Sequence, residues 1–476
     1  MELNSEEKFK AAHKFLENNE LDKAEQIYNE LLNAALHQKS NSELLLFYLG
    51  TVHMKRGNNA LAILLFKEAA ARREGFVEAI NNLGYIYKNE QLIDKARVCF
   101  DTVLELIKAP EYQEHPKEIS EYLTNRGSLS VANGTPQEAL DYFNRALALD
   151  NNNDSAHWNR GLAYLELGDY ERGFLDYDYE KRLERAKNRQ YTAEPTPDWD
   201  GTPGKTIVVY GEQGIGDELM FSSMLPDVIA DCNVILDAHP RLANLFRLNF
   251  PHIPVYGTRK SKSVPWTQFH QIDAKLAIGT LGKFYRKKLE DFPRQRYLQA
   301  DPVLVEKYER KLAALGDRAK IGVSWQGGVK STNLSSRYIV LDKWREIFKL
   351  DADFISLQYN GTAAKEVADF EQKTGFCLNH WPEVLADYDE TAGLVSNLDL
   401  IISVPQSVVH LAGALGVATW QLCPVRAMWQ MGVYGQDMPW YGSVRNYWQE
   451  TAGEWEPVLT KVKDNLWNLL AQSIAA

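Results

Sequence analysis

Residues 205–229 read KTIVVYGEQGIGDELMFSSMLPDVI. The β-branched run TIVVY predicts a strand, and ELMFSSMLPDVI predicts a helix. Between them, GEQGIGD is a glycine-rich tight turn. A strand, a tight loop and a helix in this order open an α/β unit of the nucleotide-binding type. The stretch therefore predicts a domain built around a mainly parallel sheet.

A second opening strand appears at KIGVSWQGG, residues 320–328. Other apolar runs predict further strands: CNVILDAH (232–239), IPVY (253–256), DFISLQYN (353–360), DLIISV (399–404) and ATWQLCP (418–424). Such strands alternate with helices, for example SVVHLAGALG at 407–416, which indicates parallel sheets. Two separate starts predict two Rossmann-type lobes with a cleft between them, a GT-B-like pair, at 205–300 and 301–476. The final DNLWNLLAQSIA predicts a helix, for which packing back on the first lobe is one interpretation.

The first 190 residues contain an internal repeat. A glycine recurs in steps of 34, 43 and 34 residues, at Gly50, Gly84, Gly127 and Gly161. A small residue follows twelve positions after each glycine, and an aromatic residue four positions later: Ala62 and Phe66, Ala96 and Phe100, Ala139 and Phe143, Gly173 and Tyr177. A weaker copy runs through Ala12, Ala24 and Tyr28. The nine extra residues of the middle step fall near 109–115, a polar stretch that predicts a longer turn.

This pattern resembles the tetratricopeptide repeat, a helix–turn–helix of 34 residues. Small residues let the two helices approach, the aromatic ring fills the space beside them, and neighbouring repeats bury a continuous core. We therefore expect an α-solenoid of about five repeats over residues 1–190. A proline- and glycine-rich linker over 191–204 separates it from the α/β lobes.

Arrays of this family usually bind a polypeptide in a concave groove. Two positions before the repeated glycines stand Tyr48, Asn82, Asn125 and Asn159. Three asparagines at one repeat position predict a ladder whose amides can bind a peptide backbone, and a similar ladder occurs in the O-GlcNAc transferases. The alternative is that asparagine is simply common at this position of the repeat.

The α/β region carries a second resemblance. GEQGIGD, the end of the VSWQGG strand, the arginine-bearing loop after it, ISLQ, and SVVHLAGALG followed by a tryptophan-rich PWY segment look like the ADP-heptose glycosyltransferase-related domain, glycosyltransferase family 9-like. The likeness covers roughly residues 200–470. It implies metal-independent transfer of a sugar from a nucleotide-sugar donor to a hydroxyl.

Asp217 ends the glycine-rich loop and begins a helix. In the resembling heptosyltransferases the aspartate of this GxGD motif is the proposed base, and inverting transfer needs a base for the acceptor hydroxyl. The alternative is that Asp217 only caps the helix. Gly214 and Gly216 are expected to supply close backbone approach and positive φ.

The second lobe is expected to hold the nucleotide sugar. The N-terminus of the helix at 407–416 is an anion site suited to a diphosphate, with Ser407, Val408 and His410 in its first turn. Many family members have Asp-Thr where this chain has Pro405-Gln406, which weakens the expectation of polar contacts there. A buried core histidine is the alternative for His410.

Lys330 and Arg337 could neutralise the leaving diphosphate, and the family uses basic residues in this loop. A solvated charged loop is the alternative. Gln326 and Gln358 are further candidates for donor binding, although Gln358 can equally just finish its strand. Of the C-terminal tryptophans, Trp440 is the preferred candidate for stacking on the sugar, against the more usual core position.

No metal or other cofactor is expected, apart from the nucleotide sugar as co-substrate. The DxD at 176–178 lies in a repeat helix, and the one at 351–353 reads as a turn before a strand.

The formal net charge of −11 argues against a general nucleic-acid or anionic-membrane binder. Four scattered cysteines fit a reducing compartment. The N-terminal MELNSEEKFK has no apolar core of a signal peptide, and no run of 18 apolar residues occurs, so no membrane span and a cytoplasmic location are expected.

The leading hypothesis is a glycosyltransferase, and the repeats favour a polypeptide acceptor, hence protein glycosylation. A polysaccharide or lipopolysaccharide sugar transferase is one alternative. A non-catalytic repeat adaptor with a degenerate transferase domain is another. The sequence leaves open the sugar, the nucleotide base, the acceptor, the stereochemical outcome and the oligomeric state.

Overall fold

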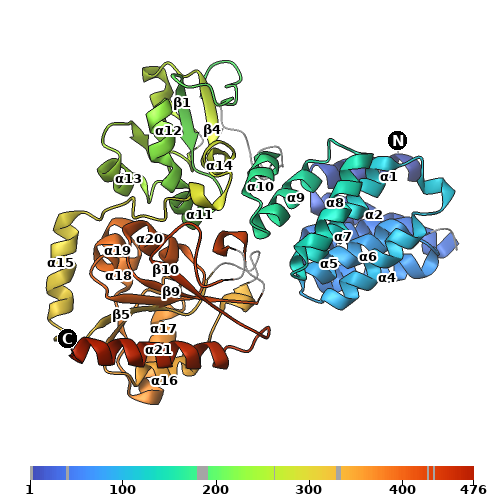
Figure 1. Ribbon diagram of the computed structural model, residues 1–476. Coiled ribbons are helices and arrows are strands. Elements are labelled where there is room, and N and C mark those ends of the chain that lie inside the picture. The colour runs from blue at the N-terminus through green and yellow to red at the C-terminus, as the bar shows by residue number, and fades with distance from the viewer. Residues whose placement is uncertain are drawn as a thin grey trace. The chain divides into compact units, whose positions relative to one another are not determined.

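A computed structural model describes residues 4–38, 42–179, 191–261, 263–327, 334–425, 428–432 and 435–475. The chain forms two compact units, Met1–Ala163 and Tyr164–Ala476. Figure 1 shows helices in the first unit and α/β lobes in the second. The predicted class, a repeat solenoid followed by two Rossmann-type lobes, is confirmed.

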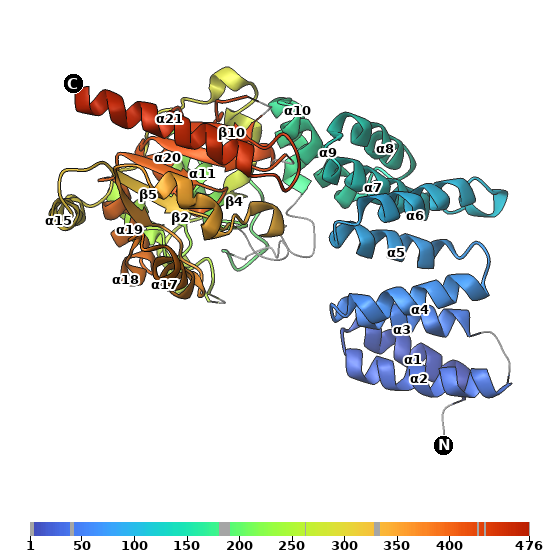
Figure 2. The ribbon, with the colours of Figure 1, turned by 90° about the horizontal axis from the view of Figure 1, so that it is seen from below.

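Within the first unit, the repeats are antiparallel helix pairs stacked one on the next (Figure 2). Their helices are α1 (Ser5–Glu17), α2 (Leu21–Gln38), α3 (Glu43–Lys55), α4 (Asn59–Arg72), α5 (Val77–Asn89), α6 (Ile93–Leu106), α7 (Pro116–Ala132), α8 (Pro136–Leu149), α9 (Asp154–Glu166) and α10 (Tyr170–Tyr177). The longer middle step contains a short 3-10 turn, Pro110–Tyr112, as the extra residues predicted.

The repeated glycines are required by close packing. A Cβ atom on Gly84 would lie 2.7 Å from the Phe100 ring, and one on Gly127 would lie 2.7 Å from the Phe143 ring. Both aromatic rings are buried and pack against the helix that carries the glycine. The glycine–aromatic pairs in the sequence are therefore direct contacts between the two helices of one repeat.

The last repeat helix, α10, belongs to the second compact unit. Its Phe174 ring packs against the glycine face of Gly282 and lies 5.9 Å from Trp429, while Tyr170 lies 4.8 Å from Phe292. The repeat signature thus extends into a helix that the α/β lobes use as part of their core.

The first lobe has a four-stranded parallel sheet in the order β3-β2-β1-β4. Its elements are β1 (Thr206–Tyr210), α11 (Ile215–Phe221), α12 (Leu225–Asp231), β2 (Asn233–Asp237), α13 (Ala243–Asn249), β3 (Val255–Tyr256), β4 (Ala274–Ala277) and α14 (Gly282–Tyr285). The chain moves outward from β1 to β3 and then returns to the other side of β1. The strand order therefore reverses beside β1, and the loop after β1 lies at this switch point.

The second lobe has a six-stranded parallel sheet in the order β10-β9-β8-β5-β6-β7. Its strands are β5 (Lys320–Ser324), β6 (Asp353–Ser356), β7 (Asn379–His380), β8 (Leu400–Ser403), β9 (Thr419–Cys423) and β10 (Val444–Trp448). Its helices are α15 (Pro302–Ala313), α16 (Arg345–Phe348), α17 (Ala363–Thr374), α18 (Pro382–Leu385), α19 (Tyr388–Val395), α20 (Ser407–Leu415) and α21 (Glu456–Ala475). The order reverses between β5 and β8, so the loops that follow these two strands meet at the second switch point.

The C-terminal helix α21 does not pack on the first lobe. Val458, Leu459, Val462 and Leu466 are buried in the hydrophobic core of the second lobe. α21 contacts α16 and β10, and Figure 1 shows it running along this lobe. The interpretation that the C-terminal helix packs on the first lobe is therefore wrong, because its apolar side chains are buried with those of the second sheet.

Candidate functional site at the two switch points

The loop after β1 brings the first lobe to the second. A Cβ atom on Gly216 would lie 3.3 Å from the Cα of Ser407 and 3.1 Å from the ring of His410. The start of α11 thus lies directly against the first turn of α20, and the close approach predicted for Gly216 is present. The structure brings together the two switch-point loops, which are far apart in the sequence.

The predicted positive φ at Gly214 and Gly216 is wrong. Gly214 has φ −90°, and the left-handed residue of the loop is Gln213, with φ 54°. The Gln213 side chain donates to the Tyr177 hydroxyl of α10, and its carbonyl accepts from Arg259. These contacts hold the loop in a conformation that sequence rules assign to glycine.

Asp217 both caps its helix and faces the second lobe. Its Oδ2 accepts a hydrogen bond from the Gly214 amide at 3.0 Å, which closes the first turn of α11. Its Oδ1 accepts one from Nε2 of Gln430 at 3.3 Å. Burial raises the pKa of the Asp217 carboxyl above its usual range, although hydrogen bonds to Gly214 and Gln430 and the charge of Arg259 oppose this. The capping interpretation is present in the geometry, and the role as a base stays a prediction.

The first turn of α20 is packed rather than open. Ser407 Oγ accepts a hydrogen bond from the buried Tyr388 hydroxyl at 2.6 Å, and Val408 is buried. Nδ1 of His410 lies 3.3 Å from the Tyr441 hydroxyl. Burial lowers the pKa of His410 to about 4, so its imidazole is neutral near pH 7. This favours the interpretation of His410 as a core residue.

Pro405-Gln406, the departure from the family pattern, joins the ends of β5 and β8. Gln406 is the N-cap residue of α20, and its Nε2 donates to the hydroxyls of Ser324 and Ser403. Gly327, in the loop after β5, packs directly against the carbonyl of Pro405. Gln406 thus holds the two loops of the second switch point together.

Gln358 is used to shape the loop after β5. Its Oε1 accepts hydrogen bonds from Ser324 Oγ, Trp325 N and Gln326 N at 2.7, 3.1 and 2.9 Å, and its Nε2 donates to Gln326 O at 3.0 Å. Gln326 Oε1 in turn accepts from Asn360. The two glutamines position the loop, and donor binding by them stays a prediction.

Arg337 is a buried cation at the same junction. Its guanidinium lies 3.8 Å from the Met428 sulfur, and burial lowers its pKa, while the charges of Tyr359 and Asp217 oppose that shift. Met428 lies two residues before Gln430, which donates to Asp217, so a short segment links the predicted donor-side cation to the predicted base. Lys330 lies outside the described residues.

Trp440 does not offer a face to a sugar. Only 3% of its surface is exposed, and its ring lies 4.8 Å from Phe292, 5.8 Å from Phe221 and 6.2 Å from Trp429. The predicted sugar contact is therefore corrected to a core role. Burying an indole among aromatic rings is the more favourable use of its large apolar surface.

Sequence reasoning missed Gln430, Tyr388 and Tyr441, which contact Asp217, Ser407 and His410 respectively. It also missed the buried pair Glu218–Arg259, 2.7 Å apart behind Asp217. Glu218 directly follows the predicted base, and Arg259 follows β3 at the same sheet edge. A carboxylate inside an apolar helical run was the available signal for this pair.

The predicted peptide ladder lies on α3, α5, α7 and α9, with each side chain partly exposed. The Asn125 amide donates to Asn81 Oδ1 at 3.0 Å, and the Asn159 amide donates to Ser155 O at 2.8 Å. Tyr48 is stacked on Tyr28 at 5.4 Å. Tyr48 also lines a cavity of about 390 Å³ with Phe9, Lys10, His13, Lys14 and Glu17. Peptide binding by these residues stays a prediction.

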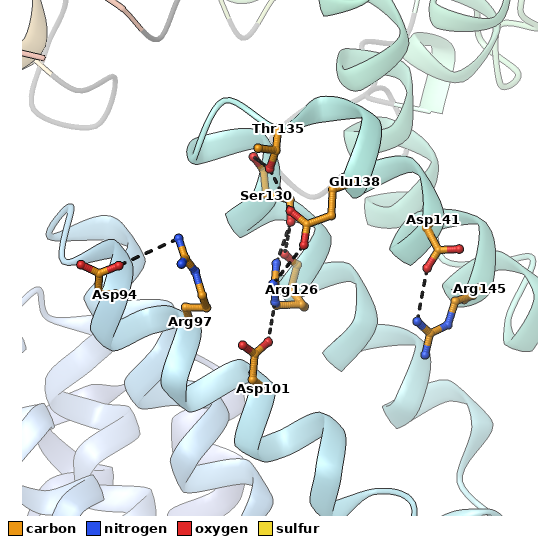
Figure 3. Close-up of polar contacts among 9 residues, drawn as sticks. All are labelled: Asp94, Arg97, Asp101, Arg126, Ser130, Thr135, Glu138, Asp141 and Arg145. Carbon is orange, nitrogen blue, oxygen red and sulfur yellow. Dashed lines mark hydrogen bonds and ion pairs between the residues drawn. The ribbon is translucent and has the colours of Figure 1, made fainter. Parts of the chain in front are cut away.

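An ion cluster around the buried Arg126 lies in the array, beside the turn between α7 and α8 (Figure 3). Arg126 precedes Gly127, and at the same position the second and third repeats have the buried Leu49 and Leu83. Its guanidinium lies 2.7 Å from Asp101 and 3.1 Å from Glu138. Asp101 lies on α6, Arg126 on α7 and Glu138 on α8, so the two ion pairs link these three helices.

Neither DxD sequence is arranged as a metal site. Asp178 lies 3.5 Å from Lys283 and accepts from Thr280 Oγ1, and Asp353 lies 2.8 Å from Lys320. Among the described residues, no group of three or more histidine, cysteine or acidic side chains is placed to hold a metal ion. The described helices also include none long and apolar enough to cross a membrane. Metal independence stays a prediction.

Family models of the tetratricopeptide repeat match residues 77–110 and 127–168. The N-terminal helices are tetratricopeptide repeats. Such repeats indicate a protein-interaction array.

The chain is 28% identical over 456 residues to Protein FlbA of Caulobacter vibrioides, covering 91% of this chain and 68% of that protein. Among solved structures, it is similar to the APC/C hetero-tetramer Cut9-Hcn1, with 22% identity and a TM-score of 0.34 over 39% of this chain and 34% of that one. It is also similar to the ADP-heptose lipopolysaccharide heptosyltransferase II of E. coli, with 13% identity and a TM-score of 0.42 over 56% of this chain and 99% of that one.

Proposed function

We propose that this protein is a glycosyltransferase that moves a sugar from a nucleotide-sugar donor to a hydroxyl, with a polypeptide held by the repeats as the acceptor. One observation carries the proposal. Asp217, at the switch point of the first sheet, accepts a hydrogen bond from Gln430 of the second lobe, and Gly216 beside it packs against Ser407 at the switch point of the second sheet. Ligands of open α/β sheets bind at such positions.

The donor side would use α20 and Arg337. α20 starts at the switch point, and the partial positive charge of its N-terminus favours a negatively charged group nearby, although Tyr388 and Gly216 pack against its first turn. Arg337 is buried in the same lobe, and its guanidinium is suited to charge-assisted hydrogen bonds with a diphosphate. A nucleoside diphosphate supplies such an anion and is also the leaving group of the reaction.

The proposed transfer moves one proton and exchanges one bond at the anomeric carbon of the sugar. The acceptor hydroxyl gives its proton to Asp217 while its oxygen forms a bond to the anomeric carbon of the sugar. The bond from that carbon to the diphosphate oxygen breaks, and the diphosphate leaves with the electron pair. The raised pKa of Asp217 suits a group that must take up this proton.

A non-catalytic adaptor is the second candidate, and a specific observation favours it. Gln358, Gln406 and Ser407, on the donor side of the junction, all make hydrogen bonds within the fold. A degenerate domain would retain such structural contacts and lose the donor.

The first experiment measures melting temperature with UDP, GDP, ADP and CMP and with sugar nucleotides made from each. For a ligand at 100 times its Kd the native state gains about 2.7 kcal/mol, and a unit of roughly 300 residues gains about 1.5 °C per kcal/mol. We expect one nucleotide to raise the melting temperature by about 4 °C, and Arg337→Ala to lose that shift. The matched control is Arg310→Ala, which removes an exposed arginine of α15.

The same donor is then used to follow release of the nucleoside diphosphate. Asp217→Asn should keep the thermal shift and reduce turnover by about 10²–10⁴-fold, the usual contribution of a general base. If no nucleotide shifts the wild type at millimolar concentration, the transferase proposal fails and the adaptor is favoured.

A further inference from the structure

Gln430, in the second lobe, donates a hydrogen bond to the predicted base, Asp217. It lies in the 3-10 turn Trp429–Met431, and only 9% of its surface is exposed. The turn is anchored on both sides of Gln430. The Trp429 ring is stacked on Phe221 at 6.1 Å, and Asn446 Nδ2 donates to Met431 O at 2.9 Å. Gln430 is therefore held in place by packing and not merely by its contact with Asp217.

The orientation of the Gln430 amide is set by charge. Nε2 donates to Asp217 Oδ1 at 3.3 Å. A flipped amide would place Oε1 against the carboxylate, where two acceptors repel each other. The hydrogen-bond donor therefore faces Asp217, and the acceptor Oε1 faces another direction.

Oε1 of Gln430 is buried and has no hydrogen-bond partner among the described residues. Leaving a buried acceptor in this state costs about 1–3 kcal/mol, so proteins seldom tolerate it without a purpose. An amide oxygen accepts only, and its missing partner must be an O–H or N–H group. Sugars are dense in such hydroxyls.

The partner belongs to the donor side of the junction. Met428, two residues before Gln430, contacts the guanidinium of Arg337, the cation assigned to the leaving diphosphate. The proton of the acceptor hydroxyl goes to Asp217 in the proposed reaction. A hydroxyl of the transferred sugar, whose diphosphate is assigned to Arg337, is a group of this reaction that fits the Oε1 acceptor.

Building on the proposed function, we propose that Gln430 is a sugar-binding residue whose Oε1 accepts a hydrogen bond from a hydroxyl of the transferred sugar while its Nε2 holds Asp217. One amide then joins the sugar to the base across the two lobes. The second lobe thus recognises the sugar at the point where the two lobes meet. The same Gln430 side chain orients Asp217.

The test compares sugar nucleotides with their own nucleoside diphosphates: UDP-N-acetylglucosamine with UDP, GDP-mannose with GDP, and ADP-glucose with ADP. Affinities are taken from thermal shifts of the full chain. In Gln430→Met, which keeps length and loses both polar atoms, affinity for the stabilising sugar nucleotide should fall about tenfold, which corresponds to about 1.4 kcal/mol. Affinity for the nucleoside diphosphate should change less than twofold. The matched control is Gln436→Met, an exposed glutamine of the same lobe.

Gln430→Glu separates the two halves of the amide. It keeps an acceptor for the sugar but puts a second carboxylate against Asp217, so sugar-nucleotide affinity should recover relative to Gln430→Met while diphosphate release stays slow. A purely structural glutamine predicts a different result. Both substitutions would then lower the melting temperature without ligand and weaken the nucleotide and the sugar nucleotide equally.

The outcomes are distinguishable. If no nucleotide stabilises the wild type, the proposed function fails and this inference fails with it. If a sugar nucleotide stabilises the wild type and Gln430→Met equally, or if the loss is the same for the bare diphosphate, only the inference is overturned.

Discussion

At the scale of the residue, Asp217 combines two roles that are usually treated as alternatives. Its Oδ2 closes the first turn of α11, and its Oδ1 is directed toward the second lobe. A base must be held rigidly relative to the atom that it deprotonates. The hydrogen bond from Gly214 to Asp217 provides this rigidity, so capping by Asp217 is compatible with a role as a base.

Asp217→Asn isolates the charge, because asparagine also accepts hydrogen bonds at a helix start. The pKa of Asp217 is raised in the native state by burial. Below the ordinary aspartate pKa of about 3.9 the carboxyl is neutral in both states. As pH rises, the unfolded state ionises first, so wild type loses stability relative to the variant until the native pKa is passed.

We therefore expect Asp217→Asn to be more stable than wild type at pH 7 and this advantage to shrink toward pH 4. Urea unfolding between these pH values measures it. Asp464→Asn, an exposed carboxylate of α21, is the control and should show no such trend. A variant less stable than wild type at pH 7 would mean that the charged carboxylate stabilises the native state.

Sequence reasoning located Asp217 because a glycine-rich turn after a strand is a local pattern. It could not locate Gln430, whose contact with Asp217 joins residues 213 positions apart. Trp440 shows the same limit in reverse. An aromatic residue in a turn-like segment gives no sign of the three rings that bury it.

At the scale of the element, the repeat helices were predictable because glycine and aromatic positions recur with a fixed period. The strands β4, β7 and β10 were not predicted. β7 has only two residues and is defined by its pairing with β6. The destination of α21 was also missed, because an amphipathic pattern states that a helix packs and not which sheet it packs on.

Gly84→Ala tests the glycine–aromatic contact between α5 and α6. The added Cβ would lie 2.7 Å from the Phe100 ring, so one of the helices must shift. We expect a loss of about 1–3 kcal/mol in the free energy of unfolding, the usual cost of overpacking. Urea unfolding followed by circular dichroism at 222 nm measures it, since this signal reports the helical array.

The control and the relief variant sharpen this test. Gly361→Ala adds a Cβ that meets nothing within 4 Å and should be neutral. Gly84→Ala with Phe100→Leu should recover part of the loss, because a smaller side chain faces the new methyl group. Equal stability of wild type and Gly84→Ala would show that the array absorbs the contact without strain.

At the scale of the whole molecule, the chain divides at Ala163 and Tyr164 into two compact units. The sequence had placed the end of the array at residue 190, because the repeat signature continues through Tyr177. A repeat signature predicts that two helices form, but it does not predict which other elements they pack against. α10 carries the signature and packs in the core of the second unit. Each unit carries a separate part of the proposed function, polypeptide binding in one and sugar transfer in the other.

This division predicts which residues a bound nucleotide protects from hydrogen exchange. Hydrogen exchange measured by mass spectrometry, with and without the nucleoside diphosphate that raises the melting temperature, should slow in the loop 211–217 and at the start of α20. Exchange in α3 to α8 should not change, because the proposed ligand contacts lie in Tyr164–Ala476. Arg337→Ala at the same nucleotide concentration should lose the protection, which ties it to the switch-point junction. Protection confined to the array would place the nucleotide in the wrong unit and contradict the assignment of the donor to the α/β lobes.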